Sequence, residues 1–503
     1  MKFVSTRTGI PATAPESVFQ GLAPDGGLFL PVLSNLSNVS NLSNVSNLRD
    51  AESFVCDALF GDFPESVRKD AIDRLLSRFP AEDPIPLVEK DGLHILELFL
   101  GKTGAFKDVA LSMLPVFMRH AAGGKRVLIL TATSGDTGSA AMQGFAGVDG
   151  TEIIVFYPAT GTSRIQKLQM TTPSEANVHA VGIRGNFDDA QAAVKRIFAS
   201  KEINDAAAKA GITLSSANSI NTGRLVPQIA YYILAGAKLC RSGKDSASPV
   251  VAAKSTGDFD VVVPSGNFGN ILAAYYAKKL GSPIRKLVVA SNVNDVLARF
   301  VKTGVYDPGD KFTVTNSPSM DIRISSNVER LLWMLNYEVE KIGGGGEEAA
   351  VKFACAEVSR MMKDLKEKGR YELNEKAKAK LFADFEGGVA TPEETEAEMR
   401  RMREAANYLV DPHTAVATFV AKKYQNGTLR SPTPTPTPHS NSLPVVVAAT
   451  ATPYKFPETC RRAFGADVLT DPPPSFVDLE RLPIAQTRVC DVDKIDAEVT
   501  RLF

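Results

Sequence analysis

From about residue 88 onward, strand-like and helix-like segments alternate along the chain, and this alternation restricts the possible folds more than any other feature. Runs rich in Val, Ile and Leu occupy residues 126–131, 152–157, 260–263 and 286–290, and a helix-like segment follows each of them. This order is typical of a parallel sheet with helices on its faces. We therefore predict an α/β fold whose ligand site lies beyond the carboxyl ends of its strands.

The chain is too long for one ordinary hydrophobic core, because it has 503 residues, and we expect several lobes. Residues 1–87 are rich in turns and predict a small N-terminal lobe, whereas residues 88–324 carry the alternation. Residues 325–440 are typical of a mainly helical insertion, and residues 441–503 return to the sheet. The predicted architecture is thus a parallel-sheet core with two additions.

Three tracts of low complexity interrupt this pattern. Residues 33–48 repeat Leu-Ser-Asn, and a period of three matches neither an amphipathic helix nor a strand, so we expect an exposed loop. The four glycines of residues 343–346 predict a flexible joint. The Thr-Pro repeat of residues 431–438 predicts an extended, polyproline-like excursion.

Composition excludes several classes of protein. Lys+Arg 57 balances Asp+Glu 57, so no overall field favours nucleic acid or an anionic membrane. The 5 cysteines are far apart and form no C-x-x-C pair, so we expect neither a metal site nor a disulfide framework. The start of the chain has no apolar signal-peptide segment, and no apolar run reaches the length of about 18 residues that a membrane span needs. These features predict a cytoplasmic protein.

Three strand–loop–helix junctions are candidates for a ligand site: residues 132–138, residues 264–270 and the loop at Thr450. In the second junction, Gly266 and Gly269 allow a tight turn and a close approach of the backbone to a ligand. Backbone N–H groups at the start of the following helix favour an anion such as phosphate. The alternative is that the Gly-Asn pairs only form turns.

A lysine and an aspartate, Lys107 and Asp108, follow a turn of small residues at the expected start of a helix. Gly101-Lys-Thr103 resembles the end of a P-loop, but the position of the required upstream glycine is Leu96, which excludes a P-loop nucleotide site. A lysine together with a separate phosphate site is the minimum that pyridoxal phosphate needs, because its aldehyde forms a Schiff base with an amine. The alternative for Lys107 is an ordinary lysine at a helix end.

Motifs in a fixed order make the interpretation more specific. The similarity extends from Val4-Ser-Thr-Arg7 to Asp411-Pro-His-Thr414 and Thr450-Ala-Thr-Pro-Tyr-Lys-Phe456, so it covers nearly the whole chain apart from the three low-complexity tracts. The central motifs are Thr103-Gly-Ala-Phe-Lys-Asp-Val-Ala-Leu111, Thr133-Ser-Gly-Asp-Thr-Gly-Ser-Ala-Ala141, Ser216-Ala-Asn-Ser-Ile-Asn-Thr-Gly-Arg224, Pro264-Ser-Gly-Asn-Phe-Gly-Asn270, Ser291-Asn-Val-Asn-Asp295 and Ser317-Pro-Ser-Met-Asp-Ile322. With these motifs the chain resembles the threonine synthase family.

The resemblance implies the fold of the tryptophan synthase β subunit, with pyridoxal 5'-phosphate as cofactor. It also implies conversion of O-phospho-L-homoserine and water to L-threonine and phosphate. Lys107 would be the catalytic residue, which forms the Schiff base and then moves protons on the substrate. Asp136 would lie near the 3′ oxygen of the cofactor, and Thr450 would face the pyridine nitrogen. The cofactor phosphate would be held by Gly266, Asn267, Phe268, Gly269 and Asn270.

For the substrate, we expect the hydroxyl and N–H groups of the loop at residues 133–137 to bind the carboxylate. Arginine binds a phosphate through two N–H groups, which favours Arg224 for the substrate phosphate. His120 and His413 are expected to pack or cap helices. The loop residues concerned are Thr133, Ser134, Gly135 and Thr137, and the further candidates for the phosphate are Lys102, Ser163, Arg164, Lys167 and Asn218.

The chain departs from the family at two places. Phe-His-Gly-Pro-Thr is common before the lysine motif, whereas this chain has Phe-Leu-Gly-Lys-Thr at residues 99–103, and Thr452 stands where a histidine is common. Two other functions stay open: a phospho-lyase that releases 2-oxobutyrate, and a non-catalytic relative that has kept the fold. The sequence does not distinguish a monomer from a dimer.

Overall fold

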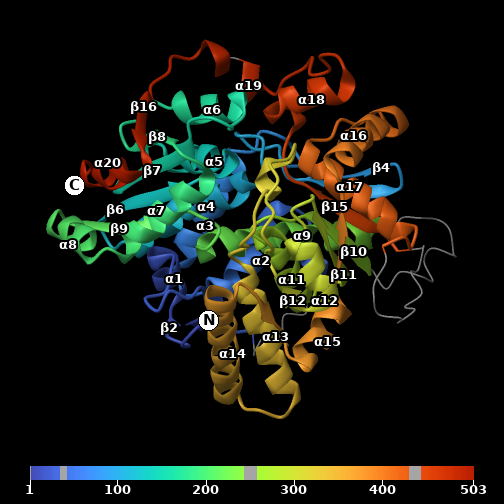
Figure 1. The fold of residues 1–503 in the computed structure, drawn as a ribbon, viewed down its shortest axis with the longest axis horizontal. Helices are drawn as coiled ribbons and strands as arrows, with labels where there is room; N and C mark the ends of the chain where they lie inside the picture. Colours follow the sequence, from blue (N-terminus) through green and yellow to red (C-terminus); the bar gives the residue numbers. More distant parts are fainter. Residues whose placement is uncertain (1, 34–41, 243–257, 430–442, 478) are drawn as a thin grey trace.

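The computed structural model describes most of the chain, and two sheets with helices around them form its centre (Figure 1). The Leu-Ser-Asn tract lies partly, and the Thr-Pro tract entirely, outside the described residues. The described ranges are residues 2–33, 42–242, 258–429, 443–477 and 479–503.

The first sheet has five strands in the order β16-β8-β7-β6-β9, and every neighbouring pair is parallel. Both faces are buried, because Leu128 and Leu130 of β6 pack on one side while Val127 and Ile129 pack on the other. Alternate residues of a strand point to opposite faces, so a strand covered on both sides is apolar throughout. The strands are β6 (Arg126–Ala132), β7 (Thr151–Pro158), β8 (Val178–Arg184), β9 (Ile212–Ser216) and β16 (Arg488–Asp491).

The second sheet has six strands in the order β14-β11-β10-β15-β5-β4, and all pairs are parallel except β4 and β5. Val262 and Val447 pack toward helix α17 (Pro412–Gln425) on one face, whereas Val261 and Val446 belong to the main core on the other. The strands are β4 (Leu87–Lys90), β5 (Leu93–Glu97), β10 (Phe259–Pro264), β11 (Ile284–Ser291), β14 (Phe385–Val389) and β15 (Val445–Ala449).

The predicted α/β class with a parallel sheet is confirmed, and the predicted strands and helices agree with the structure within a few residues. The helix expected after the run at residues 286–290 is α12 (Val296–Thr303). It does not start directly after β11, because the side chain of Asn292 accepts a hydrogen bond from the N–H of Asn294 and holds a turn there (2.9 Å). The region from residue 325 was expected to be mainly helical and also contains β14. In β14, Gly387 leaves room for α12, since a Cβ there would lie 2.9 Å from Cα of Ala298.

Helices cover both sheets. The helices of the core are α4 (Lys107–Ala121), α5 (Asp136–Phe145), α6 (Arg164–Thr171), α7 (Phe187–Ala199), α8 (Lys201–Lys209), α9 (Thr222–Ser242), α11 (Gly269–Lys279), α12 (Val296–Thr303) and α17 (Pro412–Gln425). Those near the C-terminus are α18 (Pro457–Phe464), α19 (Pro474–Val477) and α20 (Ile495–Thr500). β16 and α20 return to the outer edge of the first sheet, beside α8 (Figure 1).

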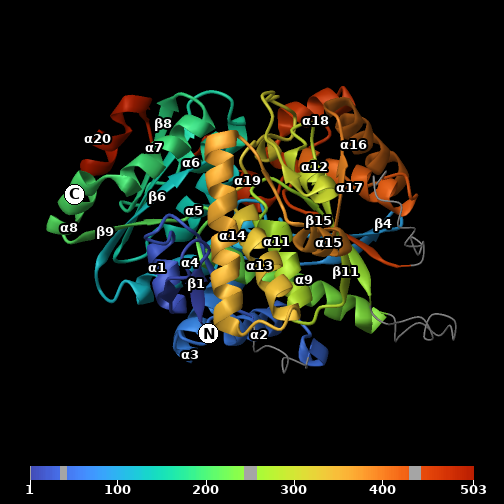
Figure 2. The same cartoon turned by 60° about the horizontal axis from the view of Figure 1, so that its bottom comes forward.

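The N-terminal segment and the helical region surround this core. Helices α13 and α14 lie side by side, and α14 stands in front of the other helices in Figure 2. Phe3, Val55 and Leu75 from the N-terminal segment share one apolar core with α4 and α9. The remaining elements are β1 (Phe3–Ser5), β2 (Pro11–Ala12), α1 (Ala14–Gln20), β3 (Phe29–Pro31), α2 (Leu48–Leu59), α3 (Glu65–Ser77), β12 (Val305–Tyr306), α13 (Val328–Ile342), α14 (Glu347–Lys368), β13 (Tyr371–Glu372), α15 (Glu375–Asp384) and α16 (Pro392–Ala406).

In the described ranges, none of the helices combines the length and the apolar character that crossing a bilayer requires.

Candidate functional site

A cavity of about 350 Å³, which we call the lysine cavity, lies where the strands of both sheets end. All three predicted junctions contribute to it, because β6, β10 and β15 each deliver a loop to this place. The predicted site residues that line it are Lys107, Thr133, Ser134, Asp136, Thr137, Asn218, Arg224, Gly266, Asn267, Phe268, Gly269, Asn270 and Thr450.

Lys107 is the first residue of α4, and the end of β15 fixes its position. The N–H of Phe106 donates to the carbonyl oxygen of Thr450 (2.9 Å), so the start of α4 is held against the second sheet. Lys107 Nζ lies 3.2 Å from Oδ2 of Asp136 and 4.4 Å from the centre of the Phe106 ring. Burial lowers the pKa of Lys107, although Asp136 opposes this shift, and the charge of Arg224 lowers the pKa further. The amine is therefore easier to deprotonate than an exposed lysine.

Asp136 begins α5 and pairs with two lysines. Its Oδ1 lies 3.1 Å from Nζ of Lys455 and accepts a hydrogen bond from Nε2 of Gln166 (2.7 Å). Burial alone would raise the pKa of Asp136, but the charges of Lys455 and Lys107 outweigh it, and the pKa is lowered. Asp136 is therefore a buried anion between two cations.

Lys455 is a residue of the site that the sequence did not reveal. Its side chain is fully buried, and Nζ donates to the carbonyl oxygen of Thr103 and to Oε1 of Gln169 (both 2.9 Å). Its only sequence signal is membership in the motif at residues 450–456, because most lysines are exposed and nothing local marks a buried one. Lys455 thereby ties the loop before Lys107 to Asp136.

The segment Gly266–Asn270 fits a phosphate group. Phe268 has a left-handed backbone (φ +63), and no side chain caps α11, which starts directly after it. A Cβ on Gly266 would lie 2.4 Å from the carbonyl oxygen of Ser319, so only glycine fits there without a shift. Nδ2 of Asn270 is a buried donor that finds no acceptor within the described residues. An anion at the start of α11 would receive hydrogen bonds from this donor and from the backbone.

Some polar groups of the loop between β6 and α5 form hydrogen bonds within the loop and the start of α5. Oγ1 of Thr133 accepts hydrogen bonds from the N–H groups of Gly135 and Gly138 (both 2.9 Å), which shapes the turn. Gly135 itself is absent from the cavity wall, since it lies against Gln166, and a Cβ there would be 2.5 Å from Gln166 Cδ. The side chains of Ser134 and Thr137 face the cavity with Thr133.

Of the residues predicted to bind the substrate phosphate, only Arg224 and Asn218 line the lysine cavity. Burial lowers the pKa of Arg224 to about 10, and its Nε finds no acceptor within the described chain. A buried guanidinium with an unused donor favours an anionic ligand.

The other phosphate candidates are not among the residues that line the lysine cavity. Ser163 caps α6 and donates to the carbonyl oxygen of Lys455 (2.8 Å), whereas Arg164 pairs with Glu480 at the surface (3.1 Å). Lys167 is exposed, and Lys102 lines a different cavity. None of these three charges lines the cavity of Lys107, and the sequence alone does not specify this.

Of the two histidines considered, His413 lines the lysine cavity and His120 does not. Nδ1 of His413 bonds Asp411 (2.7 Å), and Nε2 accepts from the N–H of Ser319 (3.1 Å), so both ring nitrogens are used. His120 lies in the last turn of α4 with its ring 5.8 Å from that of Phe63. Among the described residues, no group of three or more His, Cys, Asp or Glu side chains is placed to hold a metal ion.

A largely buried lysine paired with a carboxylate, and a glycine-rich anion site at a helix start, are what pyridoxal phosphate requires. The family model described as "Pyridoxal-phosphate dependent enzyme" matches residues 80–383, and "Threonine synthase, C-terminal" matches residues 414–501. The fold and the site thus define a pyridoxal-phosphate dependent enzyme. Threonine synthase of Saccharomyces cerevisiae is 34% identical, over 99% of this chain and 96% of that protein. The chain belongs to the threonine synthase family.

Solved structures agree with this assignment. Threonine synthase from Brucella melitensis with bound pyridoxal phosphate has a TM-score of 0.82 at 33% identity, and covers 100% of this chain and 99% of that one. The yeast threonine synthase structure has a TM-score of 0.83 at 32% identity, and covers 99% and 98%. The predicted tryptophan synthase β-like fold and the predicted cofactor are confirmed.

Proposed function

We propose that this chain is a threonine synthase, which converts O-phospho-L-homoserine and water to L-threonine and phosphate. One observation carries this proposal: a buried lysine, its carboxylate partner and a phosphate site share one cavity in a chain that matches threonine synthases from end to end. The end-to-end match favours the synthase over a phospho-lyase. The presence of Lys107 argues against a non-catalytic relative.

Residues of the lysine cavity would hold the cofactor. Lys107 Nζ would bond it covalently, the segment 266–270 would hold its phosphate, Asp136 would lie near its 3′ oxygen, and Thr450 would face its pyridine nitrogen. When bound, pyridoxal phosphate withdraws electrons from the substrate and makes its Cα and Cβ protons acidic. A neutral hydroxyl at Thr450 leaves the pyridine nitrogen largely unprotonated, which moderates this effect and disfavours transamination.

Lys107 moves the protons. Burial lowers its pKa, so the released amine is available in its neutral form as a base. Its Nζ would take protons from Cα and Cβ of the substrate and return one at Cγ and one at Cα. The bond between Cγ and the phosphate oxygen breaks, water adds its OH at Cβ, and the remaining proton of water goes to the released phosphate. Asp136, held ionised by Lys455, keeps the amine oriented between these steps.

The loop at residues 133–137 and Arg224 hold the two anionic ends of the substrate. The hydroxyls of Thr133, Ser134 and Thr137 bind the carboxylate, whereas the N–H of Gly135 is already used by Thr133 Oγ1. Arg224, with Asn218 beside it, binds the phosphate, because it is a buried cation with an unused donor.

The setting of the reaction follows from the sequence. The balance of Lys+Arg 57 and Asp+Glu 57 supports a cytoplasmic enzyme that acts on small molecules and not on nucleic acid. The proposed reaction is the last step of threonine biosynthesis in the aspartate-family pathway. In this assignment residues 88–324 and 441–503 carry the proposed site residues, while β14 and α17 from residues 325–440 complete the second sheet and its cover.

The deciding experiment incubates the purified protein with pyridoxal phosphate and O-phospho-L-homoserine, and measures threonine and 2-oxobutyrate separately. We expect threonine as the main product. A predominance of 2-oxobutyrate would identify a phospho-lyase instead. Failure to bind pyridoxal phosphate, or borohydride labelling of a lysine other than Lys107, would favour a non-catalytic relative.

A further inference from the structure

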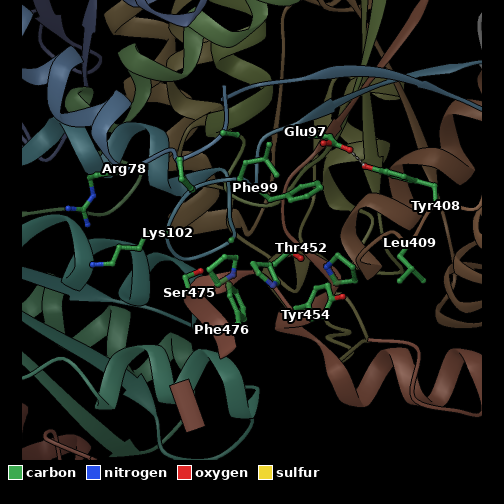
Figure 3. Close-up of a pocket in the computed structure, with 18 residues that line it drawn as sticks. Arg78, Glu97, Phe99, Lys102, Tyr408, Leu409, Thr452, Tyr454, Ser475 and Phe476 are labelled. Atoms are coloured by element: carbon green, nitrogen blue, oxygen red, sulfur yellow. Dashed lines mark hydrogen bonds between the residues drawn. The ribbon is translucent and has the colours of Figure 1, made fainter. Parts of the chain in front are cut away.

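A second cavity, which we call the apolar cavity, has a volume of about 670 Å³ and shares none of its lining residues with the lysine cavity. It lies between the loop at residues 99–104, which precedes Lys107, and the segments at residues 452–454 and 473–476 (Figure 3). Small-molecule sites typically enclose about 300–1,000 Å³, so this cavity is large enough for an organic ligand.

Two cations, Arg78 and Lys102, lie on one side of this cavity (Figure 3). Neither has a carboxylate at ion-pair distance within the described residues; Arg78 donates only to the carbonyl oxygen of Gln143 (2.5 Å). Asp108 attracts both cations, but its oxygens accept from the N–H and Oγ1 of Thr103 (2.8 and 2.7 Å). Burial, together with the charge of Arg78, lowers the pKa of Lys102. Glu175 also attracts Lys102, but neither cation has a carboxylate at ion-pair distance within the described residues. Two such neighbouring cations favour an anion beside them.

The rest of the wall is mostly apolar. Phe99, Leu100, Tyr454 and Phe476 contribute rings and aliphatic carbons to it. The one carboxylate in the wall, Glu97, is on the opposite side from the cations, where it accepts a hydrogen bond from the Tyr408 hydroxyl (2.7 Å; Figure 3). The cavity therefore offers cations at one end and apolar contact area along the middle.

We propose that the apolar cavity is a second ligand site, which binds a small organic anion with an apolar body. The acidic group, a carboxylate, sulfonate or phosphate, lies against Arg78 and Lys102, and the body lies against Phe99 and Phe476. The occupant differs from a substrate bound at Lys107, because the two cavities have separate walls.

The site is built against the loop that positions Lys107. A Cβ on Gly104 would lie 2.8 Å from Cζ of Phe476, so the wall of the apolar cavity packs directly on this loop. The carbonyl oxygen of Gly104 also accepts from the N–H of Thr452 (2.9 Å), another lining residue. A ligand in the apolar cavity would therefore contact residues that touch the loop three residues before Lys107.

The test uses 8-anilino-1-naphthalenesulfonate, whose aromatic rings and sulfonate match the proposed chemistry. Fluorescence titration of the purified full chain, saturated with pyridoxal phosphate, gives the dissociation constant. We expect saturable binding that Lys102→Gln weakens about five- to tenfold, because one of the two cations is lost. Ser475→Trp, at an exposed lining position, should weaken it at least as much by filling the cavity.

Lys125→Gln is the matched control, since Lys125 is exposed and lines neither cavity. Unchanged binding in both Lys102→Gln and Ser475→Trp would overturn the proposal, as would displacement of the probe by O-phospho-L-homoserine. The readout is binding and not turnover, so failure of this test is distinct from failure of the proposed function.

Discussion

The lysine cavity and the apolar cavity both contain cations, but only in the lysine cavity does one of them, Lys107, have a carboxylate at ion-pair distance within the described residues. In the lysine cavity, Asp136 lies 3.2 Å from Lys107 and 3.1 Å from Lys455, so the buried charges compensate one another. In the apolar cavity, Arg78 and Lys102 have no carboxylate at such a distance within the described residues. The first site is electrostatically organised before a ligand arrives, as catalysis requires, whereas the second is completed only by an anion from outside.

The largest effect should come from the lysine cavity itself. Lys107→Ala removes the base that moves the substrate protons, and we expect kcat to fall by at least about 1,000-fold. Steady-state threonine formation measures this change. Lys125→Gln, at an exposed position, is the control and should retain wild-type turnover. Activity of the Lys107→Ala enzyme within tenfold of the wild type would contradict the role of Lys107.

Asp136→Asn tests whether the compensated charges stabilise the fold. It leaves Lys107 and Lys455 buried without their anion, and we expect the free energy of unfolding at pH 7 to fall by about 3–5 kcal/mol. Folding lowers the pKa of Asp136, so its contribution is present above the pKa of an unfolded Asp and is lost as the pH falls through the folded-state pKa. Urea unfolding at neutral and acidic pH measures both effects; equal stability of variant and wild type at neutral pH would refute the charge-pairing argument.

Gly266→Val tests the phosphate site. The new Cβ would meet the carbonyl oxygen of Ser319 at 2.4 Å, so the loop must shift. We expect the affinity of the apoenzyme for pyridoxal phosphate to fall by about tenfold or more, because each tenfold step corresponds to only about 1.4 kcal/mol. Gly346→Ala is the control, because a Cβ on Gly346 would meet no atom within 4 Å. Spectroscopic titration with the cofactor gives both affinities, and an unchanged value for Gly266→Val would place the phosphate elsewhere.

Lys455→Gln tests whether the charge of Lys455 acts on Lys107, and pH dependence is the readout. The charge of Lys455 contributes to lowering the pKa of Lys107, so its removal raises that pKa. Only the neutral amine reacts with the cofactor aldehyde. The pH profile of the rate at which the apoenzyme incorporates the cofactor should therefore shift to higher pH. Visible absorbance followed at several pH values measures this. A curve that coincides with the wild type, or shifts to lower pH, would show that the Lys455 charge does not act on Lys107.

The smallest effect is expected in the apolar cavity. Tyr408→Phe removes the hydroxyl that donates to Glu97, and burial already raises the pKa of Glu97. We expect a loss of about 1–2 kcal/mol in the free energy of unfolding, because a half-buried carboxyl group loses its partner. Denaturant unfolding measures this loss. A loss as large as that of Asp136→Asn would mean that the two cavities do not differ in their dependence on internal pairing.

The sequence by itself determined the fold class and much of the lysine cavity. Strand and helix signals depend on neighbours a few residues apart, and parallel strands bring the loops after their carboxyl ends to one edge. The loops at Asp136, Gly266 and Thr450 were therefore predictable as neighbours, and they line one cavity with Lys107.

Only the tertiary structure decided which charges meet. Lys455 reaches Asp136 across more than 300 positions of sequence because β15 packs between β10 and β5, and no local pattern encodes that contact. For the same reason Lys102, only five positions before Lys107, lines the apolar cavity and not the lysine cavity. Local propensities specify where helices and strands form, whereas the direction of a side chain and its partner depend on how those elements pack.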